Sequence, residues 1–378
     1  MEVHYLKKIL FVASVYAHFA AFHKPFMKMF QEKGYEVHAA GSNSMNRKDE
    51  LNEMGVICHD VEFERFPFSK KNLKALKELN ALFQVHYYNL IHVHTPTASF
   101  LTRYIASKHN QGKILYTAHG FHFFKGASRK NWLLFYPAEK MAKRWTDGLL
   151  VMNGEDFSLG KKLGFKENQN MFHVHGVGVD LNEFHEAINK KTCLKEELSL
   201  DSNAVVICCV AELSARKNQM FLLENWETIV ERCPAANLVL IGSGNDSAKI
   251  KAYITENEMR NVHLLGYRSD VPSIIASSDI VTLVSKQEGL PRCLMEAMAC
   301  AKPIITTNIR GSKDLVDNGQ CGLVVDLGDR ERLIKSFITL IEDEQLRVNY
   351  GKSGRKKIQD YILPTVLTEM EEIYSRYL

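Results

Sequence analysis

The 378-residue chain lacks several features that would assign it to a class of protein at once. It has no run of 18 or more apolar residues, so no transmembrane helix is expected. No low-complexity stretch or internal repeat is evident. The net charge is only +4 (48 Lys and Arg against 44 Asp and Glu), which excludes a strongly basic nucleic-acid-binding protein. The zinc signature HExxH is also absent.

Cysteine is present, but its spacing is typical of neither a disulfide framework nor a zinc site. The eight cysteines include no CxxC pair, and seven lie in the second half. Cys208 and Cys209 stand in an apolar run, so we expect free thiols and a cytoplasmic location. Lys7 and Lys8 before an apolar run imitate a secretory signal. That run is short and leads into an amphipathic segment, which favours a first strand instead.

Short apolar runs alternate with segments of helical periodicity along the whole chain. We expect strands at 9–13, 36–40, 56–61, 90–93, 114–117, 148–152, 171–174, 205–210, 237–241, 262–264, 280–284, 303–306 and 322–325. Helices are expected near 22–33, 71–87, 97–109, 131–144, 155–163, 217–232, 246–258, 270–277, 291–300 and 330–343. Such alternation predicts an α/β fold with parallel sheets covered on both faces.

A domain boundary is predicted after the glycine-containing segment 176–180, where a polar stretch over residues 185–197 interrupts the alternation. We expect two doubly wound, Rossmann-like domains, 1–184 and 185–360, facing a central cleft. In such sheets, ligands bind beyond the carboxyl ends of the strands. The last segment, 361–378, has a helical pattern, and Pro364 predicts a kink or a restart within it.

The most informative segment runs from Glu288 to Glu296 and follows the strand predicted at 280–284. Gly289, Leu290 and Pro291 form a turn, and proline is favoured in the first turn of a helix. Loop amides and a helix N-terminus suit a diphosphate. A carboxylate about one and a half turns into the helix suits the hydroxyls of a ribose or a sugar. The alternative is that both glutamates are solvated surface charges.

Glu288 and Glu296 form an E-x7-E pattern that, with the neighbouring Met-Glu-Ala-Met-Ala-Cys and Lys-Pro-Ile-Ile, resembles retaining glycosyltransferases of family 4. The resemblance covers essentially the whole chain. It implies the GT-B fold, in which the C-terminal helix, here 361–378, crosses back to the N-terminal domain. It also implies that Glu288 contacts donor-sugar hydroxyls in catalysis and that Glu296 contacts the nucleotide ribose. Gly289, Leu290 and Pro291 would line the donor site.

A second segment, residues 210–219, places Arg216 and Lys217 after a buried strand and at the start of a helix. Two cations there suit a leaving diphosphate and predict catalytic roles, unless they face solvent. The family usually has Gly-Arg and then a lysine in this loop. Lys217 matches the lysine, but Glu212 occupies the arginine position, so we expect Arg216 to substitute. This departure resembles an EpsD-like subgroup of exopolysaccharide and capsule glycosyltransferases.

Two weaker signals concern the nucleotide-sugar. Gly242 and Gly244 stand between a predicted strand and helix, where they permit either close approach of a ligand or a tight turn. The resemblance implies that the backbone near Tyr267 and Arg268 contacts the base. We therefore expect Gly242, Tyr267 and Arg268 to bind the donor.

Histidine is concentrated in the first domain, which holds thirteen of the fifteen. The resemblance implies that His119, at the carboxyl end of a strand, lies near the donor sugar and phosphate and acts in catalysis. A buried structural histidine is the alternative. The candidates for the acceptor side are His18, His23, His94 and His122.

Some of these histidines are also spaced as pairs of metal ligands: His92 with His94, His119 with His122, and His173 with His175. No cysteine cluster accompanies them, and Asp-x-Asp, the usual metal anchor of other nucleotide-sugar transferases, is absent. We therefore expect no metal and no cofactor. A metal-dependent hydrolase or deacetylase is one alternative, and a catalytically silent scaffold is another.

The sequence and the resemblance together predict a retaining, metal-independent hexosyl- or N-acetylhexosaminyltransferase. The expected donor is a nucleotide-diphosphate sugar, UDP-linked. The expected acceptor is a glycan or lipid-linked oligosaccharide, such as a polyprenyl-diphosphate-linked glycan, in exopolysaccharide, capsule or lipopolysaccharide synthesis. A nucleotide-sugar 2-epimerase of the same architecture is the alternative. Nucleic acid is not an expected partner.

The small net charge hides a division between the two halves. Residues 1–184 hold 24 Lys and Arg against 17 Asp and Glu, a net of +7, and the rest hold 24 against 27, a net of −3. Cations gather on two predicted helices, at Lys70, Lys71, Lys74 and Lys77 and at Arg129, Lys130, Lys140, Lys143 and Arg144. We expect the first domain to bind the acceptor and to lie peripherally on anionic lipid at the inner face of the plasma membrane. A solvated basic face is the alternative.

Overall fold

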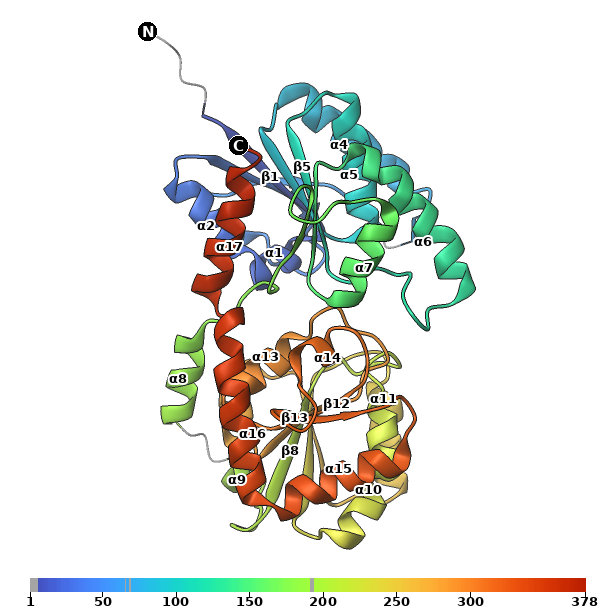
Figure 1. Cartoon of the computed structure of the whole chain (residues 1–378), viewed down its shortest axis with the longest axis vertical. Coiled ribbons are helices and arrows are strands. Elements are labelled where there is room, and N and C mark those ends of the chain that lie inside the picture. The colour runs from blue at the N-terminus through green and yellow to red at the C-terminus, as the bar shows by residue number, and fades with distance from the viewer. Residues whose placement is uncertain (1–5, 65, 68, 191–193) are drawn as a thin grey trace. The chain divides into compact units, whose positions relative to one another are not determined.

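The computed structural model describes residues 6–64, 66, 67, 69–190 and 194–378 (Figure 1). The chain divides into two compact units, Met1–Val177 with Val366–Leu378, and Gly178–Thr365. The first unit therefore ends before residue 184, where the sequence placed the boundary. The reason is α8 (Leu181–Lys190), which packs on α12 (Val271–Ser277) and buries Phe184 in the core of the second unit.

In the described part of the first unit, seven parallel strands form one sheet in the order β3-β2-β1-β4-β5-β6-β7. The strands are β1 (Lys8–Val15), β2 (Glu36–Ser42), β3 (Ile57–Asp60), β4 (Leu90–Val93), β5 (Lys113–Ala118), β6 (Gly148–Val151) and β7 (Met171–His173). The helices are α1 (Tyr16–Phe22), α2 (Lys24–Glu32), α3 (Asp49–Asn52), α4 (Asn72–Val85), α5 (Pro96–Lys108), α6 (Arg129–Ala142), η1 (Lys143–Trp145) and α7 (Gly154–Leu163).

Helices cover both faces of this first sheet because its strands are apolar on both sides. Leu10 and Val12 of β1 belong to the core that α4 and α5 complete. Phe11, between them, points to the opposite face, where its ring lies 6.0 Å from that of Phe30 in α2. A strand buried on both faces requires a continuous apolar run, which is how β1 reads in the sequence.

In the described part of the second unit, six parallel strands follow the order β10-β9-β8-β11-β12-β13. The strands are β8 (Val205–Val210), β9 (Ala236–Ile241), β10 (Val262–Gly266), β11 (Ile280–Leu283), β12 (Ile304–Thr307) and β13 (Gly322–Val325). Besides α8 and α12, the helices are α9 (Leu194–Glu197), α10 (Gln219–Arg232), α11 (Ser247–Glu256), α13 (Arg292–Ala299), α14 (Ser312–Leu315), α15 (Arg330–Glu342), α16 (Glu344–Lys357) and η2 (Ile358–Tyr361).

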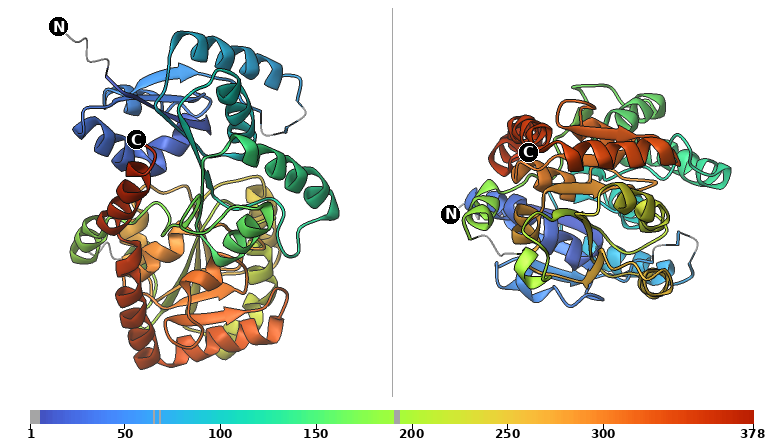
Figure 2. Two further views of the ribbon diagram at one scale, coloured as in Figure 1. Left: turned by 45° about the horizontal axis from the view of Figure 1, so that its top comes forward. Right: turned by 90° about the horizontal axis from the view of Figure 1, so that it is seen from below.

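The second sheet is also buried on both faces. Val206 and Cys208 of β8 pack with α12 and α13, whereas Ile207 and its alternating neighbours pack with α10 and α15. These last two helices lie side by side (Figures 1 and 2), and the rings of Trp226 and Phe337 join them at 5.9 Å. Each run that the sequence marked as a strand is a strand in the described residues, and the prediction of two doubly wound domains is confirmed.

The chain leaves the second unit through α17 (Leu363–Ser375), which begins directly after η2. Pro364 stands in the first turn of α17, so the helix restarts there. From Val366 onward the helix belongs to the first unit. The ring of Tyr374 lies 4.7 Å from that of Phe30, and its hydroxyl meets Nδ1 of the buried His92 at 2.8 Å.

The sequence also predicted free cysteine thiols and no transmembrane helix. The seven cysteines that lie in the described residues are free thiols, and five of them are buried. Cys193 lies outside the described residues. Within the same residues, no helix combines the length and the apolar character that crossing a bilayer requires.

Candidate active site

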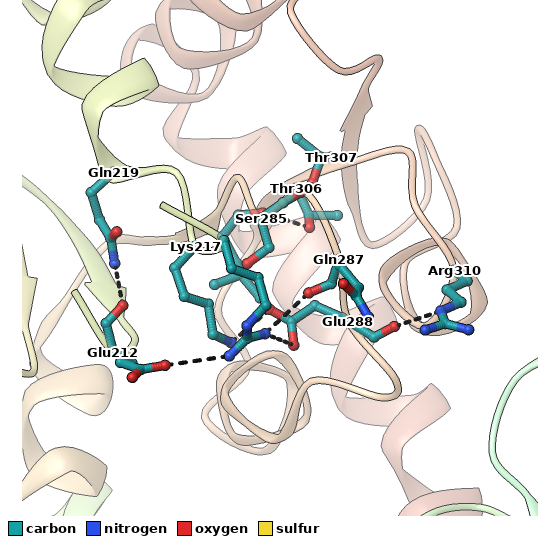
Figure 3. A network of polar contacts seen from close by, with 11 residues as sticks. Glu212, Lys217, Gln219, Ser285, Gln287, Glu288, Thr306, Thr307 and Arg310 are labelled. Atoms are coloured by element: carbon teal, nitrogen blue, oxygen red, sulfur yellow. Dashed lines mark hydrogen bonds and ion pairs between the residues drawn. The ribbon is translucent and has the colours of Figure 1, made fainter. Parts of the chain in front are cut away.

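The carboxyl ends of β8 and β11 bring Lys217 and Glu288 together in the second unit. These strands are neighbours, and the chain order of the sheet reverses between them, which is where ligands bind in doubly wound folds. Nζ of Lys217 lies 2.6 Å from Oε1 of Glu288. Both side chains are largely buried, with exposed fractions of 13% and 8%. The sequence segments around 217 and 288 thus form one site (Figure 3).

Arg216 joins this site from a more exposed position. Its guanidinium donates to the carbonyl oxygen of Gln287 at 3.1 Å, and it lies 3.5 Å from carboxylate oxygens of both Glu288 and Glu212. Glu212, which stands where an arginine was expected, therefore contacts the arginine expected to replace it. Two cations and two carboxylates share this corner of the sheet.

The loop of Glu288 and Gly289 is held by the chain segment that follows β12. Nε of Arg310 donates to the carbonyl oxygen of Glu288 at 3.0 Å, and this contact is visible in Figure 3. Gly311 has φ +75, and a Cβ atom there would lie 2.2 Å from the carbonyl oxygen of Gly289. The hydroxyl of Thr307 donates to the carbonyl of Ser285 at 2.6 Å. The conformation of this loop therefore depends on contacts with residues that are distant from it in the sequence.

Pro291 caps α13, and Glu296 follows within this helix, as the pattern of the segment predicted. The carboxylate of Glu296 lies 2.9 Å from Nε of Arg292, and its side chain is 13% exposed. Burial raises its pKa, since desolvation disfavours the charged form, while Arg292 opposes this. A largely buried carboxyl is well suited to accept hydrogen bonds from hydroxyls.

The weaker donor candidates differ from one another in their surroundings. A Cβ atom on Gly242 would lie 2.0 Å from the carbonyl oxygen of Ala211, so this glycine is needed for the contact between two strand-end loops. Tyr267 is 80% exposed. Arg268 pairs with Asp270 at 2.7 Å and also with Glu197, which together raise the pKa of its guanidinium.

In the first unit, four of the histidines named from the sequence come together. His94 and His119 directly follow β4 and β5, His18 lies in α1 after β1, and His23 lies between α1 and α2. β1, β4 and β5 are the central strands of the sheet. We call these histidines the four-histidine cluster: His18, His23, His94 and His119. Burial, followed by repulsion between neighbouring rings, lowers the pKa of the first three well below the ordinary range, and burial lowers that of His119 to about 4.

The fold therefore does not keep the predicted pairs of metal ligands together: His94 and His119 join the cluster without His92 and His122. His92 is not available beside His94, because its ring nitrogens meet the hydroxyls of Tyr374 and Thr117 at 2.8 and 2.7 Å. His122 lies apart from the cluster and packs its ring on Phe135 at 4.7 Å. His119 and His122 lie three residues apart in an irregular segment after β5.

Several residues that hold the loops of this site in place were not predicted from the sequence. Asn218 adopts φ +62 at the start of α10 and donates to the carbonyl of Val284 at 3.2 Å. Gln219 donates to the carbonyl of Glu212 at 2.9 Å (Figure 3). For Arg310, the glycine that follows it after a predicted strand is a local signal that could have indicated a tight backbone contact. The partners of such residues depend on strand order, which local sequence does not contain.

Two family models match the chain. Residues 8–153 match the model described as "Glycosyl transferase 4-like", and residues 190–357 match "Glycosyl transferases group 1". The chain is 33% identical over 379 aligned residues to the putative glycosyltransferase EpsD of Bacillus subtilis (strain 168), an alignment that covers 98% of this chain and 97% of that protein. The resemblance to EpsD-like glycosyltransferases is therefore confirmed.

A second relative and a solved structure extend the comparison. The UDP-Gal:alpha-D-GlcNAc-diphosphoundecaprenol alpha-1,3-galactosyltransferase of Escherichia coli is 29% identical, over 80% of this chain and 79% of that protein. HepE of Anabaena in complex with UDP-glucose superimposes with a TM-score of 0.79 at 20% identity, covering 98% of this chain and 99% of that chain. This likeness concerns the fold, and the expected GT-B class is confirmed.

Proposed function

The chain belongs to the group 1 glycosyltransferases, and from this membership we propose that it transfers a sugar from a UDP-sugar to an envelope glycan with retention of the anomeric configuration. The second unit holds the donor, and the first holds the acceptor. The observation that carries the proposal is the buried contact of Lys217 with Glu288 at the reversal of strand order in the second sheet.

The residues of this site suit the charges that sugar transfer develops. The bond from the anomeric carbon to the diphosphate oxygen breaks, and the acceptor hydroxyl oxygen bonds to the same face of that carbon. The hydroxyl proton passes to the departing phosphate oxygen. Lys217 and Arg216 stabilise the negative charge of the leaving diphosphate. Glu288 orients the sugar hydroxyls, Glu296 binds the ribose, and His119 of the first unit contacts the donor sugar.

Side-chain cations supply the positive charge at this site, so the proposal includes no metal cofactor for the transfer step. The proposed acceptor is a polyprenyl-diphosphate-linked glycan, the acceptor type in the name of the Escherichia coli relative. Lys70, Lys71, Lys74 and Lys77 of the first unit are exposed on or beside α4 and suit an anionic membrane surface. Salt-sensitive binding of the chain to anionic vesicles, absent with neutral ones, tests that surface.

The direct test of the function is a panel of nucleotide-sugars with extracted membrane lipid as acceptor, read out as release of nucleotide diphosphate. We expect release from one UDP-sugar only when lipid is present. Release of nucleotide and an epimerised sugar without acceptor would instead identify a 2-epimerase. Release abolished by a chelator that leaves the melting temperature of the chain unchanged would contradict a metal-independent transfer.

Lys217→Ala tests the phosphate role. Loss of a preorganised donor to developing charge should reduce turnover by about 10²–10³-fold. Lys251→Ala, at an exposed position of α11, is the matched control and should retain turnover. The melting temperature of each variant separates lost chemistry from lost folding, because Lys217 also neutralises a buried carboxylate. Near-normal turnover in folded Lys217→Ala would refute the assignment.

Glu296→Ala tests the ribose role. A hydrogen bond to a charged group contributes about 1.5–3 kcal/mol, so UDP should bind roughly 10–100-fold more weakly by calorimetry. Glu256→Ala, exposed at the end of α11, should bind UDP as the unaltered chain does. Equal affinity in Glu296→Ala and the control would exclude contact between Glu296 and the nucleotide.

A further inference from the structure

The sugar-transfer proposal uses only His119 of the four-histidine cluster, whereas the four rings together have a geometry of their own. Each residue offers one ring nitrogen, and these four atoms all lie within 4.8 Å of one another. Nε2 of His18 is 3.1 Å from Nε2 of His23, and Nδ1 of His94 is 3.2 Å from Nε2 of His119. A tetrahedral zinc ion with Zn–N bonds of about 2.0–2.1 Å requires nitrogens about 3.3 Å apart.

The surroundings of the cluster keep the imidazoles neutral, which is the form that binds metal ions. His23 and His94 are buried, with ring centroids 4.1 Å apart. Phe11 stacks on His94 with an interplanar angle of 3°, and Phe19 packs edge-on against His23. His18 and His119 are partly exposed, which leaves a route for an ion.

One ring nitrogen of the cluster also lacks a hydrogen-bond partner in the described part of the chain. Nε2 of His94 is buried and has no hydrogen-bond partner among the described residues. Hydrogen-bonded pairs of rings therefore do not satisfy all the nitrogens of the cluster. Nδ1 of His94 is the nitrogen that approaches His119, so an ion at the cluster leaves Nε2 to a bound water. His92 is not a hydrogen-bond partner for Nε2 of His94, because the hydroxyls of Thr117 and Tyr374 already contact both ring nitrogens of His92.

We propose that the four-histidine cluster binds one divalent transition-metal ion of the zinc class, with imidazole nitrogens as its protein ligands. Imidazole suits zinc, cobalt, nickel and copper, whereas magnesium and calcium prefer oxygen. The ion ties together the ends of β1, β4 and β5 and stabilises the first unit. The site shares His119 with the proposed transfer step, but the observations that support metal binding do not depend on that step. This site departs from the expectation from sequence that the chain binds no metal.

A second group of histidines in the same unit provides a contrast. His38, His59 and His86 also offer nitrogens within 4.8 Å of one another. However, Nδ1 of His38 meets the hydroxyl of Tyr88 at 2.9 Å, and its Nε2 meets Glu36 at 2.6 Å. Nζ of Lys8 lies 3.4 Å from Nδ1 of His86, and a cation at that distance repels a metal ion. We expect no tight metal binding there.

Titration of the metal-free, tag-free full chain with Co²⁺ tests the proposal. We expect one ion per chain, with the visible absorption of tetrahedral cobalt, and displacement of that signal by one equivalent of Zn²⁺. Zn²⁺ should also raise the melting temperature of the unaltered chain. Absence of the cobalt signal, or a thiolate-to-cobalt charge-transfer band that assigns the ion to cysteines, would overturn the proposal.

Variants locate the site. His18→Gln and His119→Gln remove ligands at partly exposed positions, and each should weaken Co²⁺ binding roughly tenfold or more, since even the loss of an outer-shell partner costs 10–100-fold. The double variant His59→Gln with His86→Gln is the matched control and should bind cobalt as the unaltered chain does. Unchanged binding in both ligand variants, or loss in the control, would contradict the proposal. If a ligand variant fails to fold, the titration and the zinc-dependent melting of the unaltered chain still decide it.

Discussion

Replacement of Gly311 by alanine tests how the donor loop is held. Gly311 has φ +75 and ψ −51, a conformation that strains any residue with a Cβ atom and costs about 1–3 kcal/mol. The new Cβ atom would also lie 2.2 Å from the carbonyl oxygen of Gly289, which must retreat by about 1.2 Å to reach an ordinary contact of 3.4 Å. Overpacking of this kind costs a further 1–3 kcal/mol or so.

Gly319→Ala is the matched control for Gly311→Ala. Gly319 has φ +77 in the same unit, but no atom lies within 4 Å of the position of a Cβ atom. Both variants therefore carry backbone strain, and only Gly311→Ala displaces the loop of Glu288 and Gly289. We expect the free energy of unfolding in urea to fall by about 1–3 kcal/mol more in Gly311→Ala than in the control.

The displaced loop should also impair function. A misplacement of about 1 Å can reduce a rate by about 10²-fold, so Gly311→Ala should lose turnover on that order while Gly319→Ala retains it. UDP affinity, measured by calorimetry, should weaken only in Gly311→Ala. If the two variants are indistinguishable in unfolding free energy and in turnover, the segment after β12 does not hold the donor loop.

Two further predictions concern the stability of the first unit. Arg103, fully buried, donates to both carboxylate oxygens of Glu139 at 3.0 and 2.9 Å, so Arg103→Ala should lower the free energy of unfolding by about 3–5 kcal/mol. Arg103→Met combined with Glu139→Leu should recover most of this loss in urea unfolding; no recovery would contradict the buried-charge explanation. Burial, with repulsion from His38 and His86, lowers the pKa of His59 from 6.5 to about 4. The unfolded chain then binds more protons between pH 6.5 and 4, so stability should fall as the pH falls through that window, by up to about 3 kcal/mol for this group. A His59→Gln variant with an equally steep pH profile would refute the assignment to His59.

Most strands were predictable because they are short apolar runs, and β8 and β9 are buried on both faces. Helix α16 was not predicted, since it is polar and contains two glycines. Gly351 lies where a Cβ atom would meet the carbonyl oxygen of Ala301 at 1.9 Å, so close packing, rather than helical propensity, decides its structure. The part of helix α8 from His185 onward was interpreted as a polar stretch, because only Ala187 and Ile188 of residues 185–190 are apolar.

The site residues were predictable in part. The loop of Glu288 and the cations at 216 and 217 were each found in local sequence, but their mutual contact follows from β8 and β11 being neighbours in the sheet. The histidines were found as pairs along the chain. The order β1-β4-β5 instead groups His18, His94 and His119, and local spacing contains no information on that order.

The division of the chain has a consequence for its synthesis. The first unit is interrupted by residues 178–365 and is completed only by Val366–Leu378. At about 5–20 residues per second, these 188 residues take a ribosome roughly 10–40 s. During that interval His92 lacks the hydroxyl of Tyr374, and Phe30 lacks its ring partner. The nascent first unit therefore waits with an open apolar face, the kind of surface that chaperones recognise, until the last helix has left the ribosome.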